Sequence, residues 1–346
     1  MIEMNCPLPH TDTNTIQLSH GGGGKMTHQL ISSVFYPAFS NPLLNDQHDG
    51  AVFECDGARL AYTTDSFVVD PLFFHGGNIG DLAVNGTVND LTCCGAKPLF
   101  LTAAFIIEEG FDMGKLRQIV ESMRLAAQKA GVSIVTGDTK VVDKGKCDKI
   151  FINTSGIGLV PAGLRIHPDQ IQPGDAVILS GPIGEHGVCI LSSRESLGFE
   201  TTVASDTASL NEMIGALLEE VPVHVLRDPT RGGVSSTLNE IAEASGTRII
   251  LEEEDLPVSG DVLSACDLLG IDPLYVANEG VMIIIVRESD VMKTLDILHR
   301  FPEGKNAVRV GTVSERIAGG EVLLHTYLGG NRIVEMLSGE QLPRIC

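Results

Sequence analysis

Strand-like and helix-like patterns alternate along both halves of this chain, and the alternation restricts it to an α/β or α+β fold. In the first half, strands over 52–55 and 59–63 are predicted to form a hairpin around Asp56-Gly57. Helices are predicted after it over 79–93 and 113–130, and strands over 99–107, 132–136 and 149–159. In the second half, the spacing predicts strands over 176–179, 248–251, 281–286, 308–313 and 321–325, with helices over 187–193, 210–220, 233–244, 261–269 and 290–300.

A cluster of prolines and glycines divides these halves between Pro161 and Pro173. A chain of 346 residues is long for a single core, so two domains are expected. We predict a disordered lead-in over 1–15, domains over 16–160 and 161–337, and a mobile tail over 338–346. Within the first domain, a short strand over 16–19 and a helix over 26–35 flank a run of glycines.

The formal net charge of -21 argues against nucleic acid and anionic membranes as partners, because their phosphates repel such a surface. The apolar run 281–286 suits a buried strand and is too short to span a bilayer. The first ten residues lack the features of a signal peptide, so we expect a reduced cytoplasmic protein. Its eight cysteines form no C-x-x-C pair, which argues against a zinc site.

Aspartates recur beside turns and predicted strand ends, where a magnesium–nucleotide site would need carboxylates. Asp65 and Asp138 each follow a predicted strand, and Asp90 lies in an apolar stretch where a carboxylate needs a partner or a metal ion. The alternative for each residue alone is a turn or a helix cap. The set comprises Asp49, Asp65, Asp81, Asn85, Asp90, Asp138 with Thr139, and Asp228.

Glycine-rich stretches offer a way to hold phosphate. The run His20 to Lys25 brings Gly23 and Gly24 to a predicted helix start, and Arg231 precedes a second glycine pair. The first run is neither a Walker A loop nor a dinucleotide fingerprint, and a flexible loop remains the alternative.

Two further residues are candidate acid–base groups. Glu279 directly precedes the apolar strand at Val281, and Lys140 follows Asp138-Thr139. A turn residue and a surface lysine are the corresponding alternatives. The sequence ends on Cys346, whose thiol a nine-residue tail could carry roughly 30 Å from Ser338.

Taken in order, these motifs resemble the HypE family of hydrogenase maturation factors. The resemblance covers about residues 16 to 346. The carboxylate motifs also occur in the wider superfamily of aminoimidazole ribonucleotide synthetase, selenophosphate synthetase and thiamine-monophosphate kinase, whereas the terminal Pro-Arg-Ile-Cys is more specific to HypE. The matching segments are 20–24, 63–69, 76–80, 89–91, 95–98, 137–142, 227–233, 277–280 and 343–346.

The resemblance implies an ATP-dependent enzyme that works on its own terminal cysteine. Cys346 would receive a carbamoyl group from HypF, and dehydration of the group with ATP and Mg²⁺ would leave a thiocyanate whose cyanide passes to the HypC–HypD complex. Glu279 and Lys140 would assist as bases. Magnesium would bind Asp49, Asp65, Asp90 and Asp228, and nucleotide would contact Asp65, Asp81, Asn85, Asp138, Thr139, Gly23, Gly24 and Arg231.

The same resemblance implies a homodimer in which the N-terminal, ATP-binding domains of two α/β chains pair through a β-barrel. Two other functions remain open at this point. A superfamily enzyme that phosphorylates a free small molecule would not need Cys346, and a non-catalytic metal adaptor would consume no ATP.

Overall fold

The computed structural model describes residues 15–194 and 201–338. Residues 1–14 of the predicted lead-in (1–15) and residues 339–346 of the predicted tail (338–346), Cys346 included, therefore lie outside the described residues.

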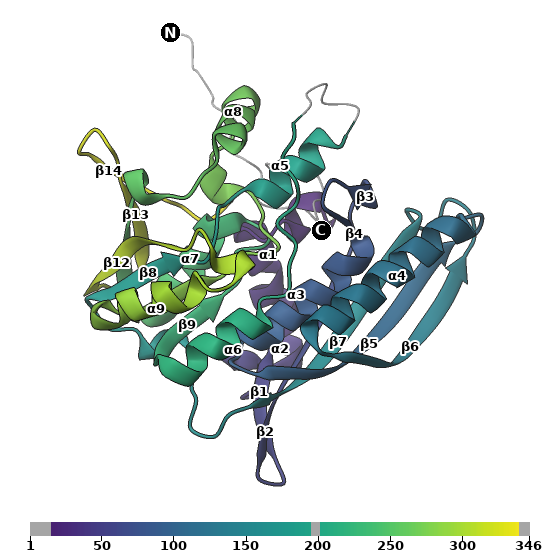
Figure 1. Ribbon diagram of the computed structural model, residues 1–346, viewed down its shortest axis with the longest axis horizontal. Helices are drawn as coiled ribbons and strands as arrows, with labels where there is room; N and C mark the ends of the chain where they lie inside the picture. Colours follow the sequence, from purple (N-terminus) through teal and green to yellow (C-terminus); the bar gives the residue numbers. More distant parts are fainter. Residues whose placement is uncertain (1–14, 195–200, 339–346) are drawn as a thin grey trace.

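The first domain is built on a five-stranded sheet, and its helices lie over one face of that sheet (Figure 1). Strands β5 and β6 run parallel and are connected through α4, whereas the other neighbours pair antiparallel. The strand order is β1 (Ala51–Cys55), β2 (Ala58–Phe67), β7 (Ile150–Val160), β5 (Lys97–Glu108) and β6 (Ser133–Val142); the covering helices are α3 (Ile79–Cys93) and α4 (Met113–Ala130), and a short pair β3 (Phe73–Phe74) and β4 (Gly77–Asn78) leads into α3.

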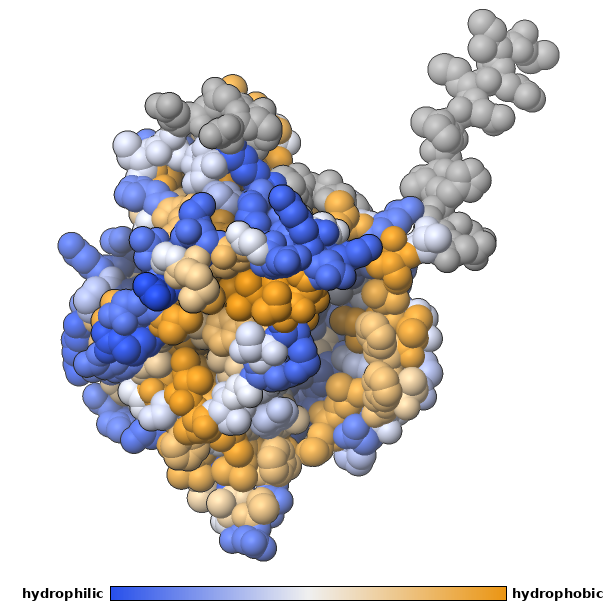
Figure 2. Space-filling view, turned by 90° about the vertical axis from the view of Figure 1, so that its right-hand side faces the viewer, coloured by the Kyte–Doolittle hydropathy of each residue, from blue (hydrophilic) through white to orange (hydrophobic). Residues whose placement is uncertain are grey.

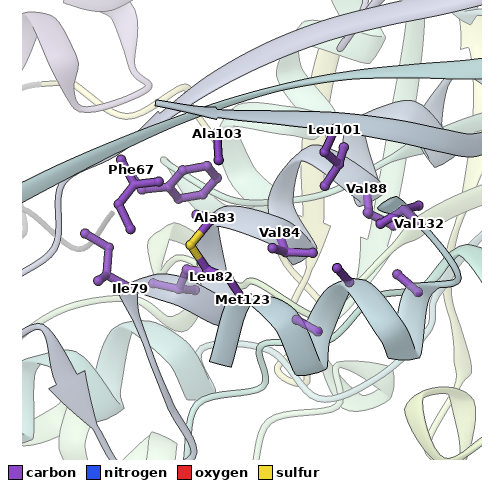
Figure 3. Packing of buried hydrophobic residues seen from close by; sticks show 14 of the residues in the cluster. Phe67, Ile79, Leu82, Ala83, Val84, Val88, Leu101, Ala103, Met123 and Val132 are labelled. Atoms are coloured by element: carbon purple, nitrogen blue, oxygen red, sulfur yellow. The ribbon is translucent and has the colours of Figure 1, made fainter. Parts of the chain in front are cut away.

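The predicted hairpin and the helices predicted over 79–93 and 113–130 are confirmed, and the helix predicted over 26–35 is divided between α-helical and π-helical turns. Asp56 and Gly57 both have positive φ (49° and 82°), as a tight hairpin turn between β1 and β2 requires. Along β2, Ala61 and Phe67 are buried while Tyr62 is exposed, so one face of the strand packs against the helices. Figure 3 shows Phe67 beside Ala103 and the side chains of α3, with Met123 of α4 below them.

The second domain has a mixed seven-stranded sheet with apolar helices on both faces. Along β8, Val177 packs in a cluster with Leu238 of α7, whereas its neighbour Ile178 packs with Met213 of α6 and Ile297 of α9. The strands are, in order, β14 (Asn331–Ile333), β13 (Glu321–His325), β10 (Thr247–Glu252), β12 (Val308–Arg316), β8 (Asp175–Leu179), β11 (Ile283–Arg287) and β9 (Val223–Arg227), and the helices are α5 (Glu185–Ser192), α6 (Asn211–Glu220), α7 (Gly233–Ser245), α8 (Gly260–Leu269) and α9 (Val291–Leu298).

The beginning and the end of the described chain lie against each other. Helix α1 (Lys25–Leu30) continues into a π-helical stretch and α2 (Tyr36–Phe39). Lys25 N donates to Leu337 O at 2.8 Å, and Lys25 Nζ pairs with Glu335 at 2.6 Å. The predicted strand over 16–19 is wrong, because Leu18–Gly21 forms a 3₁₀ turn.

The two mixed domains agree with the predicted two-domain α/β (α+β) class. Within 15–194 and 201–338, none of the helices combines the length and apolarity needed to cross a bilayer.

Candidate active site at the domain junction

The four predicted metal-binding aspartates come together where the two domains meet. Asp49 precedes β1, Asp65 lies in β2, Asp90 lies in α3, and Asp228 follows β9 of the second domain. Thr63 Oγ1 lies 2.8 Å from both Asp90 Oδ2 and the carbonyl of Asp49. The site therefore depends on both domains, although three of the four carboxylates belong to the first.

Electrostatic coupling shows how close these carboxylates are. Burial, and then the charges of Asp228, Asp49 and Asp65, raise the pKa of Asp90 well above its ordinary value. Burial and the charge of Asp49 raise the pKa of Asp228 to about 7. The protein alone thus holds mutually repelling acids in its interior, an arrangement that a cation would stabilise.

The donor atoms suit Mg²⁺, which prefers carboxylate oxygens. Among the residues that the structure describes, the buried Asp49 Oδ2 has no hydrogen-bond partner. The other oxygen, Asp49 Oδ1, lies 3.0 Å from Arg227 Nε, and Arg227 also pairs with Glu240 at 2.7 Å. Arg227 therefore orients Asp49 but leaves one of its oxygens available to a metal ion.

Asp65 and Asp138 do not end strands, so that part of the prediction is wrong. Asp65 lies within β2 on the same face as Thr63, and Ser66 N donates to it. Burial raises the pKa of Asp65, and the charge of Arg231 lowers it. The predicted nucleotide contacts Asp65 and Arg231 are therefore neighbours in space.

Asp138, Thr139 and Lys140 lie apart from this cluster within one chain. Lys140 Nζ pairs with Asp138 at 2.6 Å, and both side chains are exposed on the edge strand β6. The strand register places Asp138 three strands away from Ser66 of β2, a separation of about 14 Å. A single chain therefore does not bring Lys140 to the aspartates.

Asp81 and Asn85 are engaged in contacts that sequence reasoning missed. Asp81 accepts a hydrogen bond from the backbone N–H of Asn78 at 3.0 Å and thus caps α3. Asn85 Nδ2 donates to Thr207 Oγ1 at 3.2 Å, across to the second domain. The pattern Asn78-x-x-Asp81 before an apolar helix was a signal for the cap.

Glu279 is 3% exposed and lies in the junction. Its backbone N–H donates to Asp206 at 3.1 Å, and Asn89 of α3 donates to its carbonyl. Asn278, which is fully buried, accepts from Gly184 N at 2.7 Å and donates to Pro229 O at 2.8 Å. Asn89 and Asn278 lie in the matching segments 89–91 and 277–280, but the sequence assigned no role to them or to Asp206, because their partners are distant in the chain.

Asp206 gives a pH-dependent prediction. Burial raises its pKa to about 7, so between about pH 4 and pH 7 it is protonated in the folded chain and ionised in the unfolded chain. Ionisation therefore lowers the free energy of unfolding as pH rises through this window, by at most about 4 kcal/mol at about 1.4 kcal/mol per pKa unit. We expect Asp206→Asn to raise the melting temperature at pH 8, with a gain that shrinks toward pH 4. Thermal unfolding at stepped pH checks this, and a gain independent of pH would contradict it.

The glycines 23 and 24 are required by close packing. A Cβ on Gly24 would lie 2.2 Å from Leu337 O, and one on Gly23, where φ is +73°, would lie 2.6 Å from Arg231 Cβ. Arg231 Nη1 also donates to Gly21 O at 3.1 Å. The glycine run thus holds the end of the described chain and Arg231 together, next to Asp65.

Comparison with known proteins agrees with this architecture. Residues 47–160 match the N-terminal domain of AIR synthase related proteins, and residues 172–322 match the corresponding C-terminal domain. The carbamoyl dehydratase HypE of Cupriavidus necator is 52% identical over 96% of this chain and 95% of its own length. HypE of Escherichia coli is 46% identical over 96% of this chain and all of its own.

Solved structures are similar as well. A HypE–HypF complex superposes with a TM-score of 0.84 at 49% identity, over 89% of this chain and 99% of that one. HypE in complex with ATP gives a TM-score of 0.80 at 48% identity, over 96% of this chain and all of that one. A thiamine-monophosphate kinase from Aquifex aeolicus shares the fold, with a TM-score of 0.64 at 15% identity over 90% of this chain and 99% of that one.

Two AIR-synthase-related domains that join four aspartates at their junction define an enzyme of this two-domain class. Within the class, the chain belongs to the HypE family of carbamoyl dehydratases.

Proposed function

We propose that the chain uses ATP to dehydrate a carbamoyl group on the thiol of Cys346, giving an S-cyanide that supplies the cyanide ligand of the iron centre of [NiFe]-hydrogenase. One observation carries the proposal. The chain at Leu337 is fixed against Gly24, and the preceding Gly23 packs against Arg231, whose charge acts on Asp65 of the carboxylate cluster. From there the remaining residues could reach roughly 30 Å when extended, enough to enter the site.

ATP is the proposed energy source, and the ATP-bound structure of a relative supports it. Asp49, Asp65, Asp90 and Asp228 would hold Mg²⁺, which would neutralise triphosphate charge during phosphoryl transfer. Asn85, Asp138, Thr139 and the segment around Gly23 would contact the nucleotide.

The proposed dehydration proceeds in two steps. The carboxamide oxygen forms a bond to the γ-phosphorus while the bond to ADP breaks, and the nitrogen loses one proton. Loss of phosphate with the second nitrogen proton then leaves S–C≡N. A base is needed for both protons, and the buried Glu279 and the exposed Lys140 are the proposed groups.

A homodimer would cover the exposed strand β6. Every residue of β6 from Ser133 to Val141 is exposed, and Val135 and Val141 are 57% and 67% exposed. Figure 2 views the molecule from the β6 side of Figure 1, and apolar surface spreads over much of this face. Pairing of two such sheets into a barrel would bury it. Lys140 would then act as a base from a sheet that the two chains share.

The dimer makes a specific prediction. Val141→Asp places a charge in the proposed interface, and we expect a monomer by light scattering coupled to size exclusion. Leu268→Glu on α8, where the native residue is 69% exposed, is the matched control and should leave the dimer intact. A Val141→Asp dimer as stable as the unmodified protein would contradict the barrel.

The proposed partners are HypF as carbamoyl donor and the HypC–HypD complex as cyanide acceptor, in the cytoplasm. The solved complex of a relative with HypF supports the first. The decisive experiment is mass spectrometry of the C-terminal peptide after incubation with HypF, carbamoyl phosphate and ATP. We expect a carbamoyl adduct on Cys346 that then loses one water, and an unmodified Cys346 would refute the proposal.

A further inference from the structure

A thiol lies among the carboxylates of the junction. Cys93, in the last turn of α3, is fully buried, and its Sγ lies 3.5 Å from Asp228 Oδ1. Cys93 Sγ, an oxygen of Asp49 and an oxygen of Asp228 all lie within 4.8 Å of one another. The helix explains the placement, because Cys93 is three residues after Asp90 and so shares its face.

We propose that Cys93 is a metal ligand and that Asp49, Cys93 and Asp228 form a site for a thiophilic divalent cation, with Zn²⁺ as its best occupant. The inference rests on the proposed metal role of Asp49 and Asp228 and adds the sulfur to it. Thiolate and carboxylate together suit Zn²⁺, whereas Mg²⁺ takes oxygen ligands.

The distance between the sulfur and one of the carboxylate oxygens fits such an ion. Tetrahedral zinc with Zn–S of about 2.3 Å and Zn–O of about 2.0–2.1 Å sets its sulfur and oxygen about 3.6 Å apart. The distance from Cys93 Sγ to Asp228 Oδ1 is 3.5 Å without any rearrangement. The buried Asp49 Oδ2, which has no hydrogen-bond partner in the described part of the chain, supplies the third ligand. Binding releases the thiol proton to solvent, so the net reaction is Zn²⁺ plus thiol giving zinc thiolate plus H⁺.

The neighbouring thiol is directed elsewhere. Cys94 Sγ lies 3.5 Å from His48 Nδ1 and 3.6 Å from the carbonyl of Gly50. Cys94 therefore serves as a matched control, since both cysteines are buried and adjacent in sequence. Spacing of cysteines along the chain could not reveal this site, because two of its three ligands are aspartates from different domains.

The test uses the metal-free, full-length protein and Zn²⁺ alone, in competition with a chromophoric chelator. Other cysteines can also bind zinc, so the readout is the difference between variants. We expect Cys93→Ser to weaken one zinc site per chain at least about 10-fold and Cys94→Ser to leave that site unchanged. Equal zinc affinity in Cys93→Ser and the unmodified protein would overturn the proposal.

Crystals of the unmodified protein soaked in Zn²⁺ provide a measurement that needs no substitution. Anomalous scattering at the zinc edge should place an ion about 2.3 Å from Cys93 Sγ, between Asp49 and Asp228. Zinc bound elsewhere with none at Cys93 overturns the inference. Carbamoyl dehydration is assayed separately, with Mg²⁺. Absence of zinc at Cys93 therefore leaves the proposed function standing. If zinc binds at Cys93 but dehydration fails in the Mg²⁺ assay, only the proposed function is overturned.

Discussion

Asp228→Asn is expected to lower ATP-dependent turnover at least about 100-fold while making the metal-free protein more stable above pH 7. The loss follows because Asp228 is the carboxylate that the second domain adds to the cluster. The gain follows from its pKa of about 7. Between about pH 4 and pH 7 the folded chain keeps this acid protonated while the unfolded chain ionises it, so its ionisation costs stability as pH rises. Asparagine removes that cost.

The measurement pairs steady-state ATP hydrolysis with thermal unfolding at pH 8, with and without Mg²⁺. Mg²⁺ should stabilise the unmodified protein more than the variant, because the proposed ligand set is complete only in the former. Asp143→Asn in an exposed loop is the control and should change neither quantity. Turnover within a few-fold of the unmodified enzyme at saturating Mg²⁺ would show that Asp228 holds no essential ion.

Cys346→Ser is expected to abolish carbamoyl-dependent ATP consumption and the dehydrated adduct altogether. A thiol with a pKa near 8.5 is partly ionised near neutral pH, whereas a serine hydroxyl is not, so no carbamoyl group should be accepted. Binding of ATP itself should persist, which a rise in melting temperature on addition of ATP would show.

Cys55→Ser is the matched control for this variant, because Cys55 is an exposed thiol on the β1–β2 hairpin, and it should retain activity. The same pair of variants distinguishes the proposed function from the alternative enzyme function. An enzyme that phosphorylates a free small molecule would turn over equally in both, and that outcome would refute the proposed use of Cys346.

Local signals predicted much of the fold. The spacing of apolar residues gave α4 from Met113 to Ala130, with Gly131 in the left-handed conformation at its end, and Asp56-Gly57 gave the β1–β2 turn. The lengths of the strands were harder to predict from the sequence. β2 and β6 continue through Asp65 and Asp138, because pairing with β7 and β5 outweighs the weak strand preference of aspartate and glycine.

The candidate site was predictable where residue type alone restricts the chemistry. A carboxylate in the apolar context of Asp90 needs compensation wherever it lies, and the structure places it beside three other aspartates. Asp206, Arg227 and Cys93 were not singled out, because each acquires its role only from residues more than forty positions away in the chain. The order of the motifs likewise could not show that Lys140 lies apart from the four aspartates within one chain.

The division of the aspartates between domains has a consequence for the newly made chain. Asp49, Asp65 and Asp90 leave the ribosome long before Asp228, so a half-synthesised polypeptide carries only part of the proposed ligand set. Such fragments should not hydrolyse ATP. Two separately expressed halves should regain ATP hydrolysis only when they reassemble. With the proposed ligand set, ATP hydrolysis is therefore expected only once the second domain has been translated and has folded against the first.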